Sequence, residues 1–474
     1  MTFTTLEYAI FLNLTLVIYW FLLGKDFKKQ NTLILIVSYI FYGWWDWRFL
    51  ALIFISSLTD FLIGQFLGKT ESLPKRKLLL YSSLIINLGI LFTFKYFNFF
   101  IDTFKSCFYT SSSTGFLNID VILPVGISFY TLQTLSYTID VFDKKIKPAH
   151  DFVSFFAYVS FFPQLVAGPI ERATNLLPQF ARERKFSYPK ATDGLRQILW
   201  GLFKKMVVAD HCAIFVDNIF AAPEMHSGST LFLALIIVVF QFYCDFSGYS
   251  DIAIGSGRLL GFNLSKNFDY PLFSRNLSEF WQKWHITLIS WFRFYIVNKL
   301  KGFSKNKITR NIFIIFFATG LWHGAKWTYI VWGLLHACAF LPLIYGKRKK
   351  YRHVVANGQF LPSLQELFQM LKTFLIFALL SVFFRIDTVY DGMLYLKKIF
   401  SSSFIDIPIL PRKSAIIGIV ILLIVEWLQR HKNHGLEIDS NKIPLFIRWI
   451  TYFSLALIIL IFGARNNAFE YFQF

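Results

Sequence analysis

Long apolar runs recur along the whole chain and alternate with short polar or basic segments. A helix needs about 20 apolar residues to cross the hydrocarbon core of a membrane. Runs of roughly this kind occupy residues 6–23, 31–66, 78–100, 121–142, 152–170, 196–220, 231–255, 283–298, 311–346, 367–385, 414–429 and 445–463. The run at 31–66 is long enough for two crossings. The pattern predicts an all-α polytopic membrane protein with about 11 transmembrane helices, together with some partial or re-entrant helices.

Composition excludes two classes of protein. Hydrophobic residues make up 55% of the 474 residues and charged residues only 16%. Soluble domains have roughly 45–50% apolar residues and about 25% charged residues. A soluble protein with this composition would lack the polar surface to cover its core. A soluble enzyme and a disordered chain are therefore both excluded. The four cysteines are scattered and form no CxxC pair, so the sequence predicts neither a disulfide framework nor a metal site.

The basic residues lie in short bursts between the apolar runs. Lys and Arg number 48 against 28 Asp and Glu, which gives a net charge of +20. A nucleic-acid partner would need these cations on one solvated face, and we therefore expect no nucleic acid. Bursts between apolar runs are instead typical of cytoplasmic loops. They lie at 69–77, 144–147, 182–190, 299–310 and 347–352, whereas the cation-free connections 106–120 and 221–230 are expected outside.

The N-terminus is expected outside the membrane. Met1–Thr5 carries no positive charge, although a signal peptide needs one before its apolar core. Lys25, Lys28 and Lys29 come after the first apolar run. By the positive-inside rule they place the following loop in the cytoplasm.

The chain shows no internal repeat and no linker that would separate a second domain. The sequence therefore predicts a single integral membrane domain over residues 1–474. The missing repeat weighs against the inverted-repeat transporter folds. Trp44-Trp45-Asp46-Trp47, beside the second apolar run, is typical of an aromatic anchor at the membrane interface.

Polar residues inside apolar runs are costly, and each is a candidate functional group. Asp245 and Asp251 lie in or just past one such run, among small residues such as Ser247 and Gly248. They are candidates for substrate binding. The alternative interpretation is helix packing with structural ion pairs, for which Arg258 is one candidate partner.

The segment Trp281-Gln-Lys-Trp284-His285 is the second candidate. His285 comes four residues after Trp281, which would place both on one helical face. Ser278 is a candidate N-cap of this helix, and residues 267–271 are expected to form a polar turn. A structural histidine, hydrogen-bonded at the membrane interface, is an equal alternative for His285.

The third candidate is Trp322-His323, which Gly320 and Gly324 bracket inside an apolar run. Glycines there indicate a helix break, and broken helices at membrane depth occur where protein or a water-filled cavity surrounds them. Burial keeps an imidazole neutral, and a neutral imidazole can serve as a general base. We therefore favour a functional role for His323 over a structural one.

The other histidines give weaker signals. On a continuous helix His336 would lie about 140° around from His323, since each residue turns the helix by about 100°. We therefore assign His336 to packing or to a supporting position. His150, His226, His353, His431 and His434 lie in polar loops and are expected to be solvated.

Eight segments along the chain together carry a family resemblance. They are residues 42–46, 123–130, 161–170, 245–251, 279–286, 320–324, 332–336 and 471–474. In this order and spacing they resemble the membrane-bound O-acyltransferase (MBOAT) family, and within it the bacterial branch that contains the alginate O-acetyltransferase membrane subunit. One departure is Cys244, which stands where an aromatic or apolar residue is common.

The resemblance implies a ring of helices with a thin central region and a tunnel, and a location in the bacterial cell membrane. It implies that His323 is the catalytic histidine and that His285 occupies a second catalytic position. We expect His285 on the donor side, because it would share a face with Trp281 and lies near the basic loop at 299–310. Trp281, Trp284 and Trp322, together with Asp245 and Asp251, are then expected to bind substrate.

The implied reaction is acyl transfer, with an acetyl group as the expected cargo. The donor would be an acyl thioester on the cytoplasmic side, either acetyl-CoA or an acyl carrier, and no cofactor would be bound. The acceptor would be an extracytoplasmic polysaccharide or cell-wall glycan, reached with an esterase-like (SGNH-type) partner protein. Membrane lipid is the remaining expected partner.

Two alternatives stay open at this point. One is a D-alanyl transferase acting on teichoic acid, which would share the fold and the histidines. The terminal Tyr471–Phe474 segment and the length of the chain favour the alginate type. The other is a transporter or lipid flippase, which would place charged residues at corresponding positions of two halves and would not depend on one imidazole.

The charge pattern makes a testable prediction about topology. Cysteine introduced at Lys75 or Lys349, in a variant without the native cysteines, should resist labelling from outside the cell because both loops are expected in the cytoplasm. Cysteine at Ser112 should be labelled and serves as the matched control. Strong external labelling at position 75 or 349 would contradict the predicted orientation.

Overall fold

The computed structural model describes residues 1–108, 119, 122–300, 304–346, 353–439 and 442–463. Within these ranges every regular element is a helix, which confirms the all-α prediction. Six helices in the described part of the chain are long and apolar enough to cross a membrane. The number of about 11 spans remains a prediction, as does the ring with its tunnel. Residues 109–118, 301–303, 347–352 and 471–474, on which loop or motif predictions rested, lie outside the described residues.

The backbone groups into two compact units, residues 1–191 with 256–265, and residues 192–255 with 266–474. Most of the predicted apolar runs correspond to helices in these units. The run at 31–66 forms two helices, as expected. In the first unit the helices are α1 (Leu6–Val17), η1 (Ile18–Leu22), α2 (Phe27–Gly43), η2 (Trp47–Phe49), α3 (Leu50–Lys69), α4 (Leu73–Leu91), η3 (Phe92–Tyr96), α5 (Phe97–Phe108), α6 (Ile127–Phe142), α7 (Phe152–Ser160), α8 (Phe162–Leu165) and α9 (Ala173–Phe180).

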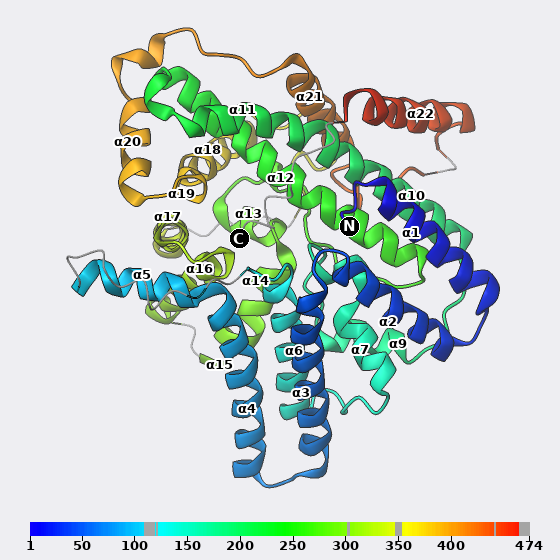
Figure 1. The fold of residues 1–474 in the computed structure, drawn as a ribbon. Helices are drawn as coiled ribbons and strands as arrows, with labels where there is room; N and C mark the ends of the chain where they lie inside the picture. Colours follow the sequence, from blue (N-terminus) through cyan, green and yellow to red (C-terminus); the bar gives the residue numbers. More distant parts are fainter. Residues whose placement is uncertain (109–118, 120–121, 301–303, 347–352, 440–441, 464–474) are drawn as a thin grey trace. The chain divides into compact units, whose positions relative to one another are not determined.

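A buried carboxylate joins three helices of the first unit. Figure 1 shows α3, α4 and α6 side by side. Asp60 of α3 accepts hydrogen bonds from Asn87 of α4 at 2.9 Å and from Thr138 of α6 at 2.7 Å, and Ser83 of α4 is a further donor. A buried carboxylate is tolerated only where such donors replace water. This polar contact therefore fixes how the three apolar helices pack.

The second unit contains the remaining helices, with α10 and α12 each running across its boundary. They are α10 (Tyr188–Leu202), η5 (Phe203–Ala209), α11 (Asp210–Ala221), η6 (Pro223–Met225), α12 (Gly228–Leu259), η7 (Pro271–Phe273), α13 (Leu277–Lys283), α14 (Ile286–Phe292), η8 (Arg293–Val297), α15 (Asn298–Leu300), α16 (Lys305–His323), α17 (Trp327–Tyr345), α18 (Leu364–Leu380), α19 (Val382–Arg385), α20 (Val389–Ile399), η9 (Ser402–Ile405), α21 (Lys413–Leu428) and α22 (Leu445–Phe462).

Helix α12 is the most buried of the six long apolar helices in the described part of the chain. In its most apolar window 78% of the residues are buried, against 6% for α22. Gly248 of α12 lies against Gly201 of α10, and a Cβ on either glycine would come within 2.8 Å of the other's carbonyl oxygen. Glycine is required there because the two backbones approach so closely.

The run at 311–346 forms two helices, α16 and α17, which pack against each other. The predicted break is present, but it lies at residues 324–326, and Gly320 is inside α16. Gly320 and Gly333 instead let the helices approach, since a Cβ on Gly333 would overlap with the carbonyl oxygen of Phe316. A second correction concerns the start of α13, which Asn276 caps in place of Ser278 by accepting from the Glu279 amide.

The close approach of α16 and α17 can be tested with one methyl group. Gly333→Ala should destabilise the protein by about 1–3 kcal/mol, because the added Cβ cannot be accommodated without moving a backbone. Gly89→Ala is the matched control, since a Cβ there meets no atom within 4 Å. Thermal unfolding of both variants in detergent checks this, and equal melting temperatures would contradict the packing described.

Candidate functional site

His323 is the last residue of α16, and only 3% of its surface is exposed. Its ring centroid lies 5.1 Å from Trp322, 5.4 Å from Trp332 and 4.9 Å from Phe384. These neighbours come from α16, α17 and α19. Aromatic walls on three elements exclude water, and polar contacts are stronger in such a low-dielectric setting.

His285 lies between two short helices and is 1% exposed. Helix α13 ends at Lys283 and α14 begins at Ile286, while His285 itself adopts a left-handed conformation with φ +44°. The prediction that His285 shares a helical face with Trp281 is therefore wrong, because that spacing rule needs a continuous helix. A left-handed histidine is strained, and such strain persists where the surrounding contacts enforce it.

A side-chain amide holds His285 in place. Nδ1 of His285 lies 3.1 Å from Oδ1 of Asn267. The same oxygen accepts from the Thr287 hydroxyl at 2.8 Å, and Nδ2 of Asn267 donates to the Ser250 hydroxyl of α12 at 3.0 Å. Asn267 was predicted only as part of a polar turn, so this contact is one that sequence reasoning missed. The feature of the sequence that could have indicated this contact is an Asn within a short polar segment between two apolar runs.

Aromatic rings connect the two predicted catalytic histidines. The Trp322 indole lies 5.5 Å from the ring of His285 and 5.1 Å from that of His323. The Phe246 ring of α12 packs edge-on against His285 at 4.6 Å. The structure thus brings His285, Trp322 and His323 together, although 38 positions separate the two histidines along the chain.

Trp281 and His336 form the neighbouring part of this aromatic cluster. Trp332 lies 5.4 Å from His323 and 4.8 Å from His336, and Trp281 lies 5.1 Å from His336. The angular argument that separated His336 from His323 fails, since the helix breaks between them. The packing role assigned to His336 remains a prediction. Trp284 is enclosed by rings such as Phe280 at 5.3 Å.

Two buried lysines, which the sequence analysis missed, pair with the predicted carboxylates. Lys205 lies 2.6 Å from Asp245 and also 2.6 Å from Asp210, while Lys204 lies 2.6 Å from Asp251. These are ion pairs of the kind that the structural alternative expected. The signal was visible, since Lys204-Lys205 interrupts the apolar run 196–220. Substrate binding by Asp245 and Asp251 remains a prediction.

One of the histidines expected in solvent is buried instead. His434 is 2% exposed, and its Nε2 lies 3.0 Å from Oδ1 of Asp193. It borders a small polar cavity of about 20 Å³, which Lys204, Asp251 and Asn267 also line. This volume suits about one water molecule. The prediction failed because a polar loop sequence does not show that the loop folds back onto helices.

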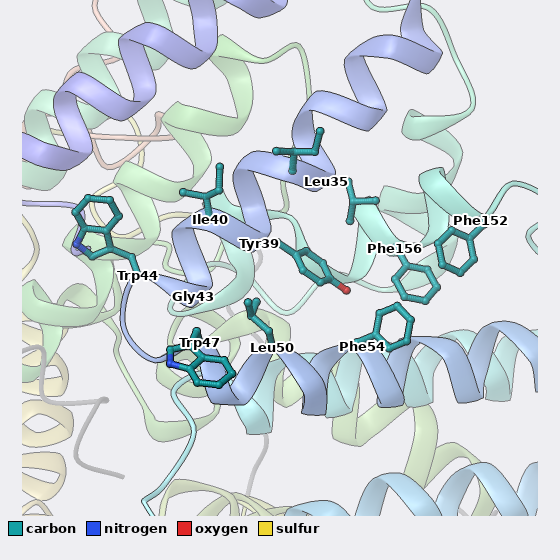
Figure 2. A pocket seen from close by; sticks show the side chains of 11 residues that line it. Leu35, Tyr39, Ile40, Gly43, Trp44, Trp47, Leu50, Phe54, Phe152 and Phe156 are labelled. Atoms are coloured by element: carbon teal, nitrogen blue, oxygen red, sulfur yellow. The ribbon is translucent and has the colours of Figure 1, made fainter.

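A larger groove in the first unit is lined, among the described residues, by no histidine, lysine or carboxylate. Figure 2 shows side chains of α2, η2, α3 and α7 around an apolar groove, among them Tyr39, Trp47 and Phe156. The groove has a volume of about 630 Å³. Trp44 and Trp47 are 59% and 75% exposed, and their role as interfacial anchors remains a prediction. No group of three His, Cys, Asp or Glu side chains that could hold a metal ion occurs in the described part of the chain.

Comparison with known proteins identifies the family. Residues 40–349 match the profile of the membrane-bound O-acyltransferase family, a stretch that is more than half of the 474 residues and includes both histidines. The chain belongs to this family. The resemblance seen in the sequence is thereby confirmed, and the protein is a multi-pass membrane protein.

Individual relatives differ in what they are named for. A probable alginate O-acetylase of Pseudomonas syringae is 38% identical over 67% of this chain and 61% of its own length. The peptidoglycan O-acetyltransferase of Helicobacter pylori is 31% identical over 77% of this chain and 72% of its own. The teichoic acid D-alanyltransferase of Bacillus subtilis is 27% identical over 50% of this chain and 64% of its own. The first match thus spans less than two thirds of the relative's length.

The buried ion pairs make a prediction about stability. Lys204→Met should destabilise the protein by about 3–5 kcal/mol, because Asp251 is then left without its cation. The double variant Lys204→Met/Asp251→Asn should recover most of that loss, since neither partner is then a buried charge. Thermal unfolding in detergent measures both. If Lys204→Met melts like the wild type, the pair is not structural.

Proposed function

We propose that the protein is a membrane O-acyltransferase that moves an acetyl group from a cytoplasmic thioester to hydroxyls of an extracytoplasmic polysaccharide or cell-wall glycan. The observation that carries this proposal is that His323 and His285 are both buried and both pack against the Trp322 indole. The family supports acyl transfer over transport. The names of the alginate and peptidoglycan relatives support a glycan acceptor.

The chemistry requires one base and one leaving group. His323 takes the proton of the acceptor hydroxyl as its oxygen attacks the thioester carbonyl carbon. The tetrahedral intermediate then collapses, the C–S bond breaks, and the leaving thiolate takes the proton back from His323 to give the free thiol. The products are an ester and a thiol, so no oxidant or metal is consumed. A neutral imidazole is the group suited to this proton transfer near pH 7.

The aromatic walls around His323 contribute through water exclusion. Trp322, Trp332 and Phe384 cover the imidazole from three elements. A thioester that met water there would hydrolyse instead of acylating the acceptor. Excluding water therefore protects the donor and strengthens every polar interaction with the developing oxyanion.

The proposal has four further parts. The donor is acetyl-CoA or an acyl carrier, and an esterase-like protein is the partner. The protein lies in the bacterial cell membrane, with its N-terminus outside. The thioester reaches the site from the cytoplasm because its carrier is a cytosolic species. A D-alanyl transferase is the weaker candidate, since that relative matches half of the chain at 27% identity, against two thirds at 38% for the alginate relative.

The role of His323 can be tested with two substitutions. His323→Ala and His323→Gln should both lower acyl transfer by about 10²–10⁴-fold, because neither side chain accepts a proton at neutral pH. Transfer of labelled acetyl to the acceptor measures the effect, and size exclusion in detergent checks the fold.

The matched control is His434→Gln, which changes another buried histidine in the same way. Glutamine at position 434 can still donate a hydrogen bond to Asp193, so this variant should keep nearly normal transfer. Nearly normal transfer by His323→Gln would reject the assignment of His323 as the base.

A further inference from the structure

The orientation of the Asn267 side chain is fixed by its neighbours. The backbone N–H of Thr287 points at Oδ1 of Asn267 over 3.4 Å, and the Thr287 hydroxyl donates to the same oxygen at 2.8 Å. A backbone N–H can only donate, so the atom facing it must be the amide oxygen and not the amide nitrogen. The amide nitrogen then points the other way, where Ser250 accepts from it.

This orientation decides which nitrogen of His285 carries the proton. Oδ1 of Asn267 can only accept, so Nδ1 of His285, 3.1 Å away, must be the donor. Burial favours the neutral imidazole, which has a single N–H. Nε2 therefore carries the lone pair. The tautomer of a histidine is set in this way by the hydrogen bond that its other nitrogen makes.

Nε2 is the other ring nitrogen of His285. It is fully buried and has no hydrogen-bond partner among the described residues. The ring packs against Phe246 and Trp322, and Trp322 leads directly to His323. Buried polar atoms are rarely left without a partner, and exceptions call for a functional explanation.

We propose that Asn267 is a positioning residue, which holds His285 in the Nδ1–H tautomer so that Nε2 accepts a hydrogen bond from an N–H or O–H of a substrate. The tautomer follows from the contacts of Asn267 and the burial of the ring, without any assumption about the reaction. Only the substrate bond rests on the proposed acyl transfer. Helix α12 supports the arrangement, because Ser250 accepts from Asn267 and Phe246 packs against the imidazole.

The tautomer can be observed without any activity. In protein with ¹⁵N-labelled histidine, the nitrogen chemical shifts separate ring nitrogens that carry a proton from those that carry a lone pair. Subtracting the spectrum of His285→Gln isolates the signals of His285. We expect Nδ1 with the proton and Nε2 without it in the wild type. In Asn267→Leu this preference should be lost.

Activity measurements complete the test. Asn267→Leu should lower acyl transfer at least about tenfold, since a wrong imidazole tautomer costs up to about 10⁴-fold in a serine protease. Asn267→Asp keeps an accepting oxygen at the same place, so it should retain the tautomer and more activity than the leucine variant. Thr287→Val is the matched control, because it removes another donor to the same oxygen and leaves the contact with His285.

The outcomes separate the two proposals. A proton on Nε2 in the wild type, or an unchanged tautomer in Asn267→Leu, would overturn the role of Asn267. Failure of acyl transfer to depend on His323 would overturn the proposed function and leave the tautomer result intact. A higher KM for the thioester in Asn267→Leu would show that the group donating to Nε2 belongs to the thioester donor. A lower kcat alone would show that it is the acceptor hydroxyl.

Discussion

The second unit depends on two adjacent lysines whose charges are buried against carboxylates of α12. Lys204 pairs with Asp251 and Lys205 with Asp245, from a π-helical segment that lies beside α12. Each charge would be costly alone in this apolar interior, so the two segments are held in one register. The glycine contact between Gly201 and Gly248 then brings the backbones close enough for the short lysine-to-carboxylate distances.

Two residues of α12 contact the candidate site, so the position of this helix also positions the site. Phe246 packs against the imidazole of His285, and Ser250 accepts from Asn267, whose amide oxygen faces Nδ1 of the same imidazole. His285 itself has no helix to hold it, since it occupies the break between α13 and α14. Its strained backbone persists because α12 and the Asn267 turn enforce it from two directions.

Both candidate catalytic histidines lie at the end of a helix and not on a helix face. His323 closes α16, and His285 precedes α14. Trp322, Trp332 and Phe384 cover His323, and Trp322 also packs against His285. The groove in the first unit shows the contrast, since its lining is almost wholly apolar and offers no base.

The sequence by itself determined the membrane class, the approximate helices and the family, because hydropathy and the spaced motifs are local properties of the chain. It also singled out His323 and His285. It failed wherever a conclusion needed the geometry of a break: His285 and Trp281 do not share a face, and His323 and His336 belong to one cluster. Only the tertiary structure showed Lys204, Lys205 and Asn267 as partners, since the contacts that give them a role join residues 18 to 47 positions apart. Packing decides which partners a buried charge or amide contacts, and the hydropathy of one segment does not show which other segment packs against it.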